Sequence, residues 1–149
     1  MMDCHRYLGR KGVSMIEMLM VVGVIGLVAL FVFPSVVRIF DHIQVRGART
    51  VVINNFNSAR TAARISNRMT ELKLSGNQIW IERYKAVGKD TLGTMTNLST
   101  EYGVLISGPS SIRIDPRGML ETSGTAKFVL SRGGWSDSVM ISNYGKVSR

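Results

Sequence analysis

The sequence predicts an α+β protein in which a long N-terminal helix, transmembrane in its first part, packs against a C-terminal antiparallel β-rich head. Three observations predict this fold class. Residues 13–37 carry only one charged side chain, Glu17. A helical pattern of apolar residues continues from there to about Ser66. Short β-like runs separated by turn residues follow to the C-terminus, and a length of 149 residues suits a single domain.

The apolar segment is the first element of the chain. Every residue from 18 to 33 is apolar or glycine, and about 20 such residues span a hydrocarbon core of about 30 Å. Arg6, Arg10 and Lys11 precede the segment, and such a positive flank stays cytoplasmic. The sequence therefore predicts a single-pass protein, with residues 13–37 in the membrane and 38–149 on the periplasmic side.

A secretory signal peptide is the alternative for this segment, since it also has a basic start and an apolar core. Its cleavage site requires small residues after the core, whereas Phe31, Val32 and Phe33 are bulky. The helical pattern also continues past Pro34. A retained membrane helix is the better interpretation.

Glu17 is a charge within an apolar helix, which costs about 2.5 to 3.5 kcal/mol at the bilayer centre and less near its surface. A cut after Gly12 creates a partner for it, because the new α-amino group of Val13 lies one helical turn away or reaches Glu17 of a neighbouring subunit. The alternative is a capping box, in which Ser14 and Glu17 only start the helix. Capping is the preferred interpretation for Ser14, and for Glu17 the two roles can coexist.

The motif G-V-S-M-I-E at residues 12–17, followed by the apolar run, resembles the processing signal of type IV pilins and type II secretion pseudopilins. The resemblance implies that a prepilin peptidase removes residues 1–12 and that Val13 is then N-methylated, although the family usually has Phe or Met there. It also implies that Glu17 acts in filament assembly. Pro34 stands where the family commonly carries a helix-kinking proline.

The helical period continues beyond Pro34, shifts slightly past Gly47, and predicts one helix to about Ser66. Its apolar positions recur at spacings of three and four: Val36, Ile39, Phe40, Ile43, Val51, Val52, Phe56, Ala59, Ala62 and Ala63. The outer face is basic with a single acid, and we interpret it as a solvated surface: Arg38, Asp41, Arg46, Arg49, Arg60, Arg64 and Arg68.

The predicted head consists of short strands. They cover residues 70–74, 78–84, 104–107, 112–114, 118–121, 126–131 and 138–142. Ser75-Gly76-Asn77 predicts a hairpin turn and Asp115-Pro116-Arg117-Gly118 a tight turn. Residues 86–101 show no period and are expected to form a loop. Four large side chains are expected in the core: Trp80, Phe128, Trp135 and Ile141.

The composition argues against an enzyme. The formal charge is +9, which favours anionic partners such as phosphate backbones or lipid headgroups. Loss of residues 1–12 removes three basic residues, one acidic residue and Cys4, which leaves +7 and no cysteine. Only His42 then remains as a histidine, and Asp137 alone makes no calcium site. No catalytic residue, metal or cofactor is expected.

A second resemblance covers nearly all of the mature chain. The motifs S-A-R-T-A-A at 58–63, I-R-I-D-P-R-G at 112–118 and V-M-I-S-N-Y-G-K-V at 139–147 look like the GspH/FimT family of minor pseudopilins. This implies a minor subunit of a type II secretion pseudopilus or a type IV pilus that supports filament assembly and protein secretion. The implied partners are other pilins, the prepilin peptidase and the bacterial inner membrane.

The alternative function is DNA binding during uptake. Members of this branch that act in DNA uptake end in a basic G-R-x-R tail, and here the chain ends in Gly145-Lys146-Val147-Ser148-Arg149. Lys146 replaces an arginine but still contacts phosphate as a point charge. Arg132 is expected to join Lys146 and Arg149 from a loop. The competing interpretation of Lys146 and Arg149 is an exposed, charged chain end.

Overall fold

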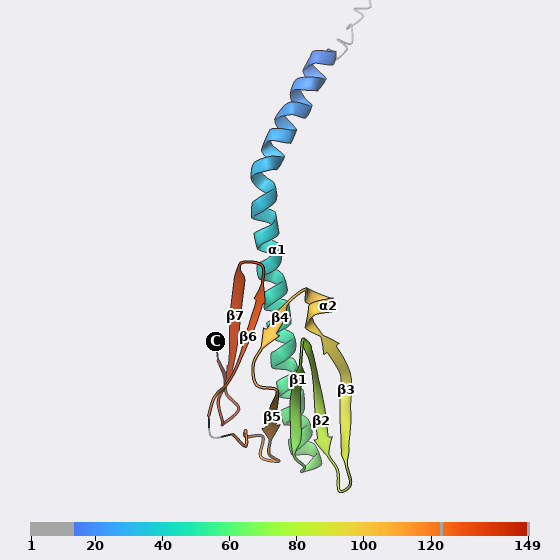
Figure 1. Cartoon of the computed structure of the whole chain (residues 1–149), viewed down its shortest axis with the longest axis vertical. Helices are drawn as coiled ribbons and strands as arrows, with labels where there is room; N and C mark the ends of the chain where they lie inside the picture. The colour runs from blue at the N-terminus through green and yellow to red at the C-terminus, as the bar shows by residue number, and fades with distance from the viewer. Residues whose placement is uncertain (1–13, 123, 149) are drawn as a thin grey trace, which may run out of the picture. The chain divides into compact units, whose positions relative to one another are not determined.

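The computed structural model describes residues 14–122 and 124–148 of the chain. The chain divides into two compact units, Met1–Val37 and Arg38–Arg149, and the second is called the head unit below. Helix α1, Met15–Ser66, runs from the first unit into the second. Among the described residues, a short helix and eight strands follow it in the chain, and Figure 1 shows the elements of the head unit.

In the head unit, α1 buries a stripe of apolar side chains at spacings of three and four, which places them on one face of the helix. They are Val45, Ala48, Val52, Phe56, Ala59 and Ala63. The helix ends where expected, at Ser66. Asn67 then takes a left-handed φ of 49°, and the N–H of Arg68 donates to the carbonyl of Ala63 at 3.2 Å, as in a Schellman-type helix end.

The first sheet has the order β3-β2-β1-β5, with all neighbours antiparallel. Its strands are β1 Thr70–Ser75, β2 Gln78–Tyr84, β3 Lys89–Asn97 and β5 Ser111–Ile114. One face of the sheet is apolar and buried, with Leu72, Ile79, Ile81, Ile112 and Ile114 in the core. The alternate residues point away from the core and, apart from Trp80, are polar.

The second sheet has the order β4-β6-β7-β8, again antiparallel. Its strands are β4 Leu105–Ser107, β6 Ala126–Arg132, β7 Trp135–Ile141 and β8 Val147–Ser148. Helix α2, Leu98–Tyr102, lies in the chain between β3 and β4 and is capped by the Asn97 side chain. Buried residues of α1 and of both sheets form one core cluster.

Most predicted strands are confirmed, as is the hairpin turn at Gly76, whose φ is +57°. Two assignments are wrong. Residues 86–101 form β3 and α2 rather than a loop. Residues 118–121 form no strand, because only Leu120 pairs, in an isolated bridge with Ile114.

The core assignments need two corrections. Phe128 and Ile141 are buried as expected, but Trp80 is only half-buried and Trp135 is 45% exposed. Trp80 alternates with buried Ile79 and Ile81 on β2 and faces away from the core. Trp135 is on the same face of β7 as buried Val139 and Ile141 but lies beyond the end of the core, against His42. On α1, the predicted apolar positions Ile39, Phe40 and Ile43 are exposed.

Candidate functional site

The apolar half of α1 exposes its side chains. From residue 15 to 37 every described side chain is exposed, and Glu17 is the one charged residue among them. This part of the helix is long and apolar enough to cross a membrane, with a mean hydropathy of 2.7. A bare apolar surface of this length requires a cover of lipid or of other apolar helices.

The start of α1 is described only in part. The N–H groups of Glu17 and Met18 donate to the carbonyl of Ser14 at 3.0 and 3.2 Å. Among the described residues, the Ser14 hydroxyl makes no hydrogen bond, so a capping box is not seen. Gly12 and Val13, the predicted cleavage and methylation positions, lie outside the described residues, as does Arg149.

Arg132 is held where the β6–β7 hairpin turns. Its Nε donates to Oδ1 of Asp41 at 2.8 Å and its Nη1 donates to the carbonyl of Tyr102. Trp135, across the turn, packs on His42, with ring centroids 4.7 Å apart. The guanidinium of Arg132 thus ties the hairpin to α1.

Lys146 lies in a turn at the other end of the same hairpin. The strand register pairs Arg132 with Trp135 at one end and Ala126 with Ile141 at the other. That separation is about 20 Å at the usual rise per strand residue. The structure therefore does not bring Arg132 and Lys146 together.

Other basic residues do accompany Lys146. Arg60 of α1 donates through Nη1 and Nη2 to the carbonyls of Gly145 and Tyr144, both at 3.3 Å. Arg64, one turn later, donates through Nε to the carbonyl of Arg117 at 3.1 Å. These contacts hold two loops against one face of α1.

Two glycines let those loops meet. Gly118 and Gly145 both have positive φ, +83° and +76°, and a Cβ at Gly145 would lie 3.0 Å from the carbonyl oxygen of Gly118. The four basic side chains that gather there are called the basic loop cluster: Arg60, Arg64, Arg117 and Lys146. Within the described part of the chain, none of the four forms an ion pair.

Asp115, an acid near the basic loop cluster, already accepts hydrogen bonds within its own turn. Asp115 accepts hydrogen bonds through Oδ1 from the N–H groups of Arg117 and Met119, at 2.9 and 2.8 Å. This confirms the predicted tight turn, in which the Gly118 N–H also donates to the Asp115 carbonyl. The cluster therefore presents net positive charge.

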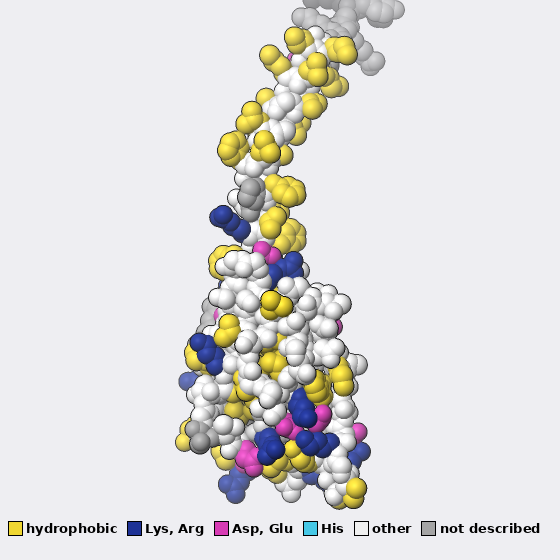
Figure 2. Space-filling model, viewed as in Figure 1, with side chains coloured by type: hydrophobic (Ala, Val, Ile, Leu, Met, Phe, Trp, Pro, Cys, Tyr) yellow, Lys and Arg dark blue, Asp and Glu magenta, His cyan; other side chains and the backbone are white. Residues whose placement is uncertain are grey.

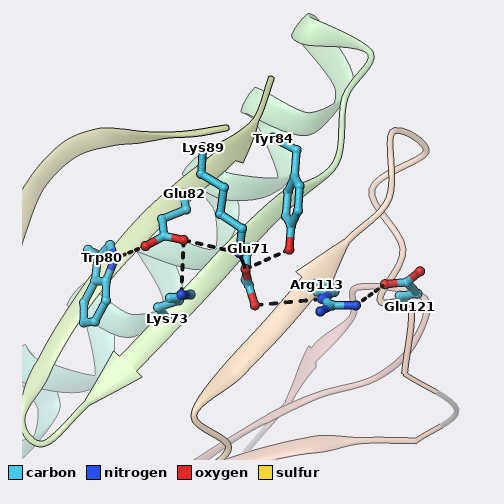
Figure 3. Close-up of polar contacts among 8 residues, drawn as sticks. All are labelled: Glu71, Lys73, Trp80, Glu82, Tyr84, Lys89, Arg113 and Glu121. Carbon is cyan, nitrogen blue, oxygen red and sulfur yellow. Dashed lines mark hydrogen bonds and ion pairs between the residues drawn. The ribbon is translucent and has the colours of Figure 1, made fainter. Parts of the chain in front are cut away.

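A second polar cluster covers the outer face of the first sheet (Figure 3). Glu71 is almost fully buried, with 4% of its side chain exposed. It accepts from Lys89 Nζ at 2.6 Å and from the Tyr84 hydroxyl at 3.1 Å. Arg113 Nε lies 3.9 Å from its other oxygen.

Glu82 continues this network. It accepts from the Trp80 indole at 2.9 Å and pairs with Lys73 at 3.2 Å and with Lys89 at 3.6 Å. The hydrogen bond from Trp80 contributes most to holding the pKa of Glu82 below its usual value.

Burial raises the pKa of Glu71, but hydrogen bonds from Lys89, Ser111 and Tyr84 outweigh it and the net pKa is lowered. The hydrogen bond to Glu71 in turn raises the pKa of Lys89. Both carboxylates are therefore ionised and paired at neutral pH, which suits stabilisation of the sheet better than proton transfer. The alternation of polar residues along β1 and β2 signalled an outer face but not its pairing.

Within the described ranges, no three His, Cys, Asp or Glu side chains gather as a metal site would require. The absence of catalysis stays an expectation of the sequence. Two surfaces remain as candidates for function: the exposed apolar helix with Glu17 and the basic loop cluster.

Comparison with solved structures decides the fold. The crystal structure of the type IV minor pilin FimU of Pseudomonas aeruginosa superposes with a TM-score of 0.61 over 72% of this chain and 88% of that one, at 14% identity. This chain has the type IV pilin fold. A second crystal form of FimU gives a TM-score of 0.57 and 15% identity, with 69% and 90% covered.

No protein-family model matches the sequence, and no curated protein matches it. At 14–15% identity, the likeness to FimU establishes the pilin fold alone. The roles of individual residues have to be argued from this chain's own contacts.

Proposed function

We propose that this protein is a minor subunit of a filament of the type IV pilus or type II secretion pseudopilus class, in the GspH/FimT branch, and supports filament assembly and protein secretion. One observation carries the proposal: a pilin-fold head follows an exposed apolar helical segment, residues 15–37, whose only charge, at Glu17, is near its start. In this account the cover of the helix is first lipid and later the helices of neighbouring subunits.

Processing follows from the same arrangement. A prepilin peptidase removes residues 1–12 on the cytoplasmic side and Val13 becomes the N-methylated first residue. The head then lies in the periplasm, anchored to the inner membrane by a single helix until it enters the filament. The basic residues before Gly12 support this orientation.

Glu17 gives the filament its register in this proposal. Its carboxylate sits in an apolar surface and is stabilised by an α-amino group, either its own or that of a neighbour. Glu17→Ala is expected to leave membrane insertion and cleavage intact and to reduce recovery of the protein in sheared filaments. The measurement is the amount of mature chain in the sheared and membrane fractions of producing cells.

Glu101→Ala is the matched control, because it removes an exposed acid from the head unit. It is expected to enter filaments as the parent does. Equal recovery of the Glu17→Ala and parent proteins would contradict the assembly role of Glu17.

A second function, binding of DNA during uptake, is favoured by the basic loop cluster. Two guanidinium groups, Arg60 and Arg64, add to Lys146 and Arg117 at one end of the head unit. Contacts of such groups with phosphate carry no base information, so weak binding of duplex DNA without sequence preference is expected. Arg132 has no part in this surface because Asp41 holds it elsewhere.

The salt dependence of binding tests this function. Each phosphate contact that is lost lowers the slope of log K against log salt by about 0.9 for duplex DNA. Lys146→Ala with Arg117→Ala in the full chain in detergent should therefore flatten the slope by nearly two. Arg46→Ala with Lys85→Ala removes the same charge elsewhere and should change it little.

No binding at low salt, or equal slopes for the two double variants, would return the cluster to a structural role. The filament proposal would stand without the DNA function. Arg60 and Arg64 are left in place in these variants because they hold the two loops.

A further inference from the structure

One end of the head unit, where α1 enters it, has both an ion pair and exposed apolar side chains. Arg132 and Trp135, on either side of the β6–β7 turn, contact Asp41 and His42. The hairpin turn therefore lies beside the first turns of α1 within the head unit (Figure 1). These contacts fix Trp135 at the level of residue 42 along the helix.

Exposed apolar side chains occur at the same level. Ile39, Phe40 and Ile43 are between 55% and 59% exposed, and Trp135 is 45% exposed. Hydrophobic side chains are visible where α1 meets the head unit in Figure 2. A soluble surface rarely carries such groups together unless something covers them.

These groups lie on more than one side of α1. Val45 faces the core, and Phe40 and Ile43 differ from it by about 140° and 200° around a helix of 3.6 residues per turn. Phe40 and Ile43 therefore point away from the core. Trp135 covers a different side of α1, where the head packs on His42. A protein neighbour would cover one side of the helix, whereas a planar surface crossing the helix reaches all sides.

The distance along the chain fits a membrane surface. Residues 18–37 rise about 30 Å as a helix, the thickness of a hydrocarbon core. Residue 42 lies about 7.5 Å further on, and the headgroup layer extends about 5–8 Å beyond the core. The level of Ile39 to His42 therefore corresponds to that layer.

The indole of Trp135 suits this layer chemically. Among the described residues its N–H has no hydrogen-bond acceptor, unlike the Trp80 N–H, which donates to Glu82 at 2.9 Å. Tryptophan gathers at the interface between membrane and water because its ring is apolar and its N–H is polar. Arg38 is exposed at the same end, and its guanidinium can pair with a lipid phosphate.

We propose that this end of the head unit is a membrane-surface anchor, in which Trp135, held against His42 by the Arg132–Asp41 tie, lies among the lipid headgroups around α1. The inference rests on the membrane insertion in the proposed function. It adds a contact that holds the head at the bilayer surface before assembly.

The two tryptophans of the chain allow a direct test. The Trp80→Phe variant of the full chain retains only Trp135, and Trp135→Phe retains only Trp80 as the matched control. Each is reconstituted at low protein-to-lipid ratio into vesicles of phosphatidylethanolamine and phosphatidylglycerol. Trp135 should show strong quenching by headgroup nitroxide and protection from aqueous acrylamide, whereas Trp80, which is half-buried in the protein itself, should show no quenching by the nitroxide.

Vesicle flotation separates the two proposals. A chain that fails to float with vesicles would overturn the membrane insertion and this inference with it. A chain that floats while headgroup nitroxide quenches Trp135 no more than Trp80 would overturn this inference alone. Protection of Trp135 that appears only at high protein-to-lipid ratio would also overturn it, since a second copy would then be the cover.

Discussion

Glu71 is a buried carboxylate whose charge is compensated by hydrogen bonds and ion pairs. Its carboxylate is nearly inaccessible, yet it receives a lysine, a tyrosine hydroxyl and an arginine from three other strands. A buried carboxylate is tolerated only with such partners. This network lies on the outer face of the first sheet, where solvent would otherwise reach the strands.

Glu71→Gln is expected to lower the free energy of unfolding by about 1–3 kcal/mol at pH 7, because Lys89 and Arg113 lose a charged acceptor. The lowered pKa of Glu71 means that its contribution is present above its unfolded pKa of about 4.3 and is lost as the pH falls through the folded pKa. The difference between parent and variant should therefore shrink under acid conditions. Chemical denaturation across a pH series measures it.

Glu121→Gln is the control, since Glu121 is half exposed and pairs with Arg113 only at 3.8 Å. Its effect should stay within about 0.5 kcal/mol. A Glu71→Gln variant as stable as this control at pH 7 would show that the network adds little. Some acid sensitivity should persist in Glu71→Gln because the pKa values of Glu82 and Asp90 are lowered as well.

Among the helices and strands, the sequence predicts those with a long helical period or a strict alternation of apolar and polar residues. The helix to Ser66 and strands such as β1 and β2 have clear periods. Strand β3 was missed because its Thr and Gly residues do not alternate with apolar ones, and Gly93 interrupts it with a φ of +75°. Helix α2 has five residues, too few for a period to appear.

Elements also depend on contacts that no local pattern encodes. Arg60 and Arg64 were interpreted as part of a solvated stripe, but they bind loops that follow them by 53 to 85 positions in the chain. Arg49 likewise pairs with Asp137 at 3.5 Å. The basic loop cluster is therefore beyond sequence reasoning, although three of its members, Arg60, Arg117 and Lys146, belong to the motifs at 58–63, 112–118 and 139–147.

The turn at Gly118 is where that long-range packing is most constrained. Gly118 has a φ of +83°, and a Cβ there would meet Arg60 Cγ at 3.0 Å. Gly118→Ala should therefore lower the free energy of unfolding by about 1–3 kcal/mol. Thermal or denaturant unfolding of the purified variant measures the change.

Gly124→Ala serves as the comparison, because a Cβ there meets nothing within 4 Å. It should change stability by no more than about 0.5 kcal/mol. If both alanine variants unfold at the same denaturant concentration, the close packing of the loops against α1 is not a source of stability.

At the scale of the whole molecule, one helix serves two environments. Its first part is apolar on every side, whereas in the head unit it buries one stripe and binds loops and strands through charged groups on other sides. The change of pattern beyond Pro34 made the fold class predictable from the sequence. The similarity to FimU in two crystal forms confirms it.

In the filament proposal the protein is cut after Gly12 and built into a filament. The most direct measurement is the intact mass of the chain recovered from sheared filaments. We expect the mass of a chain that begins at Val13, with or without one added methyl group. A chain that still begins at Met1, one cut beyond Pro34, or its absence from filaments that form normally would contradict the account.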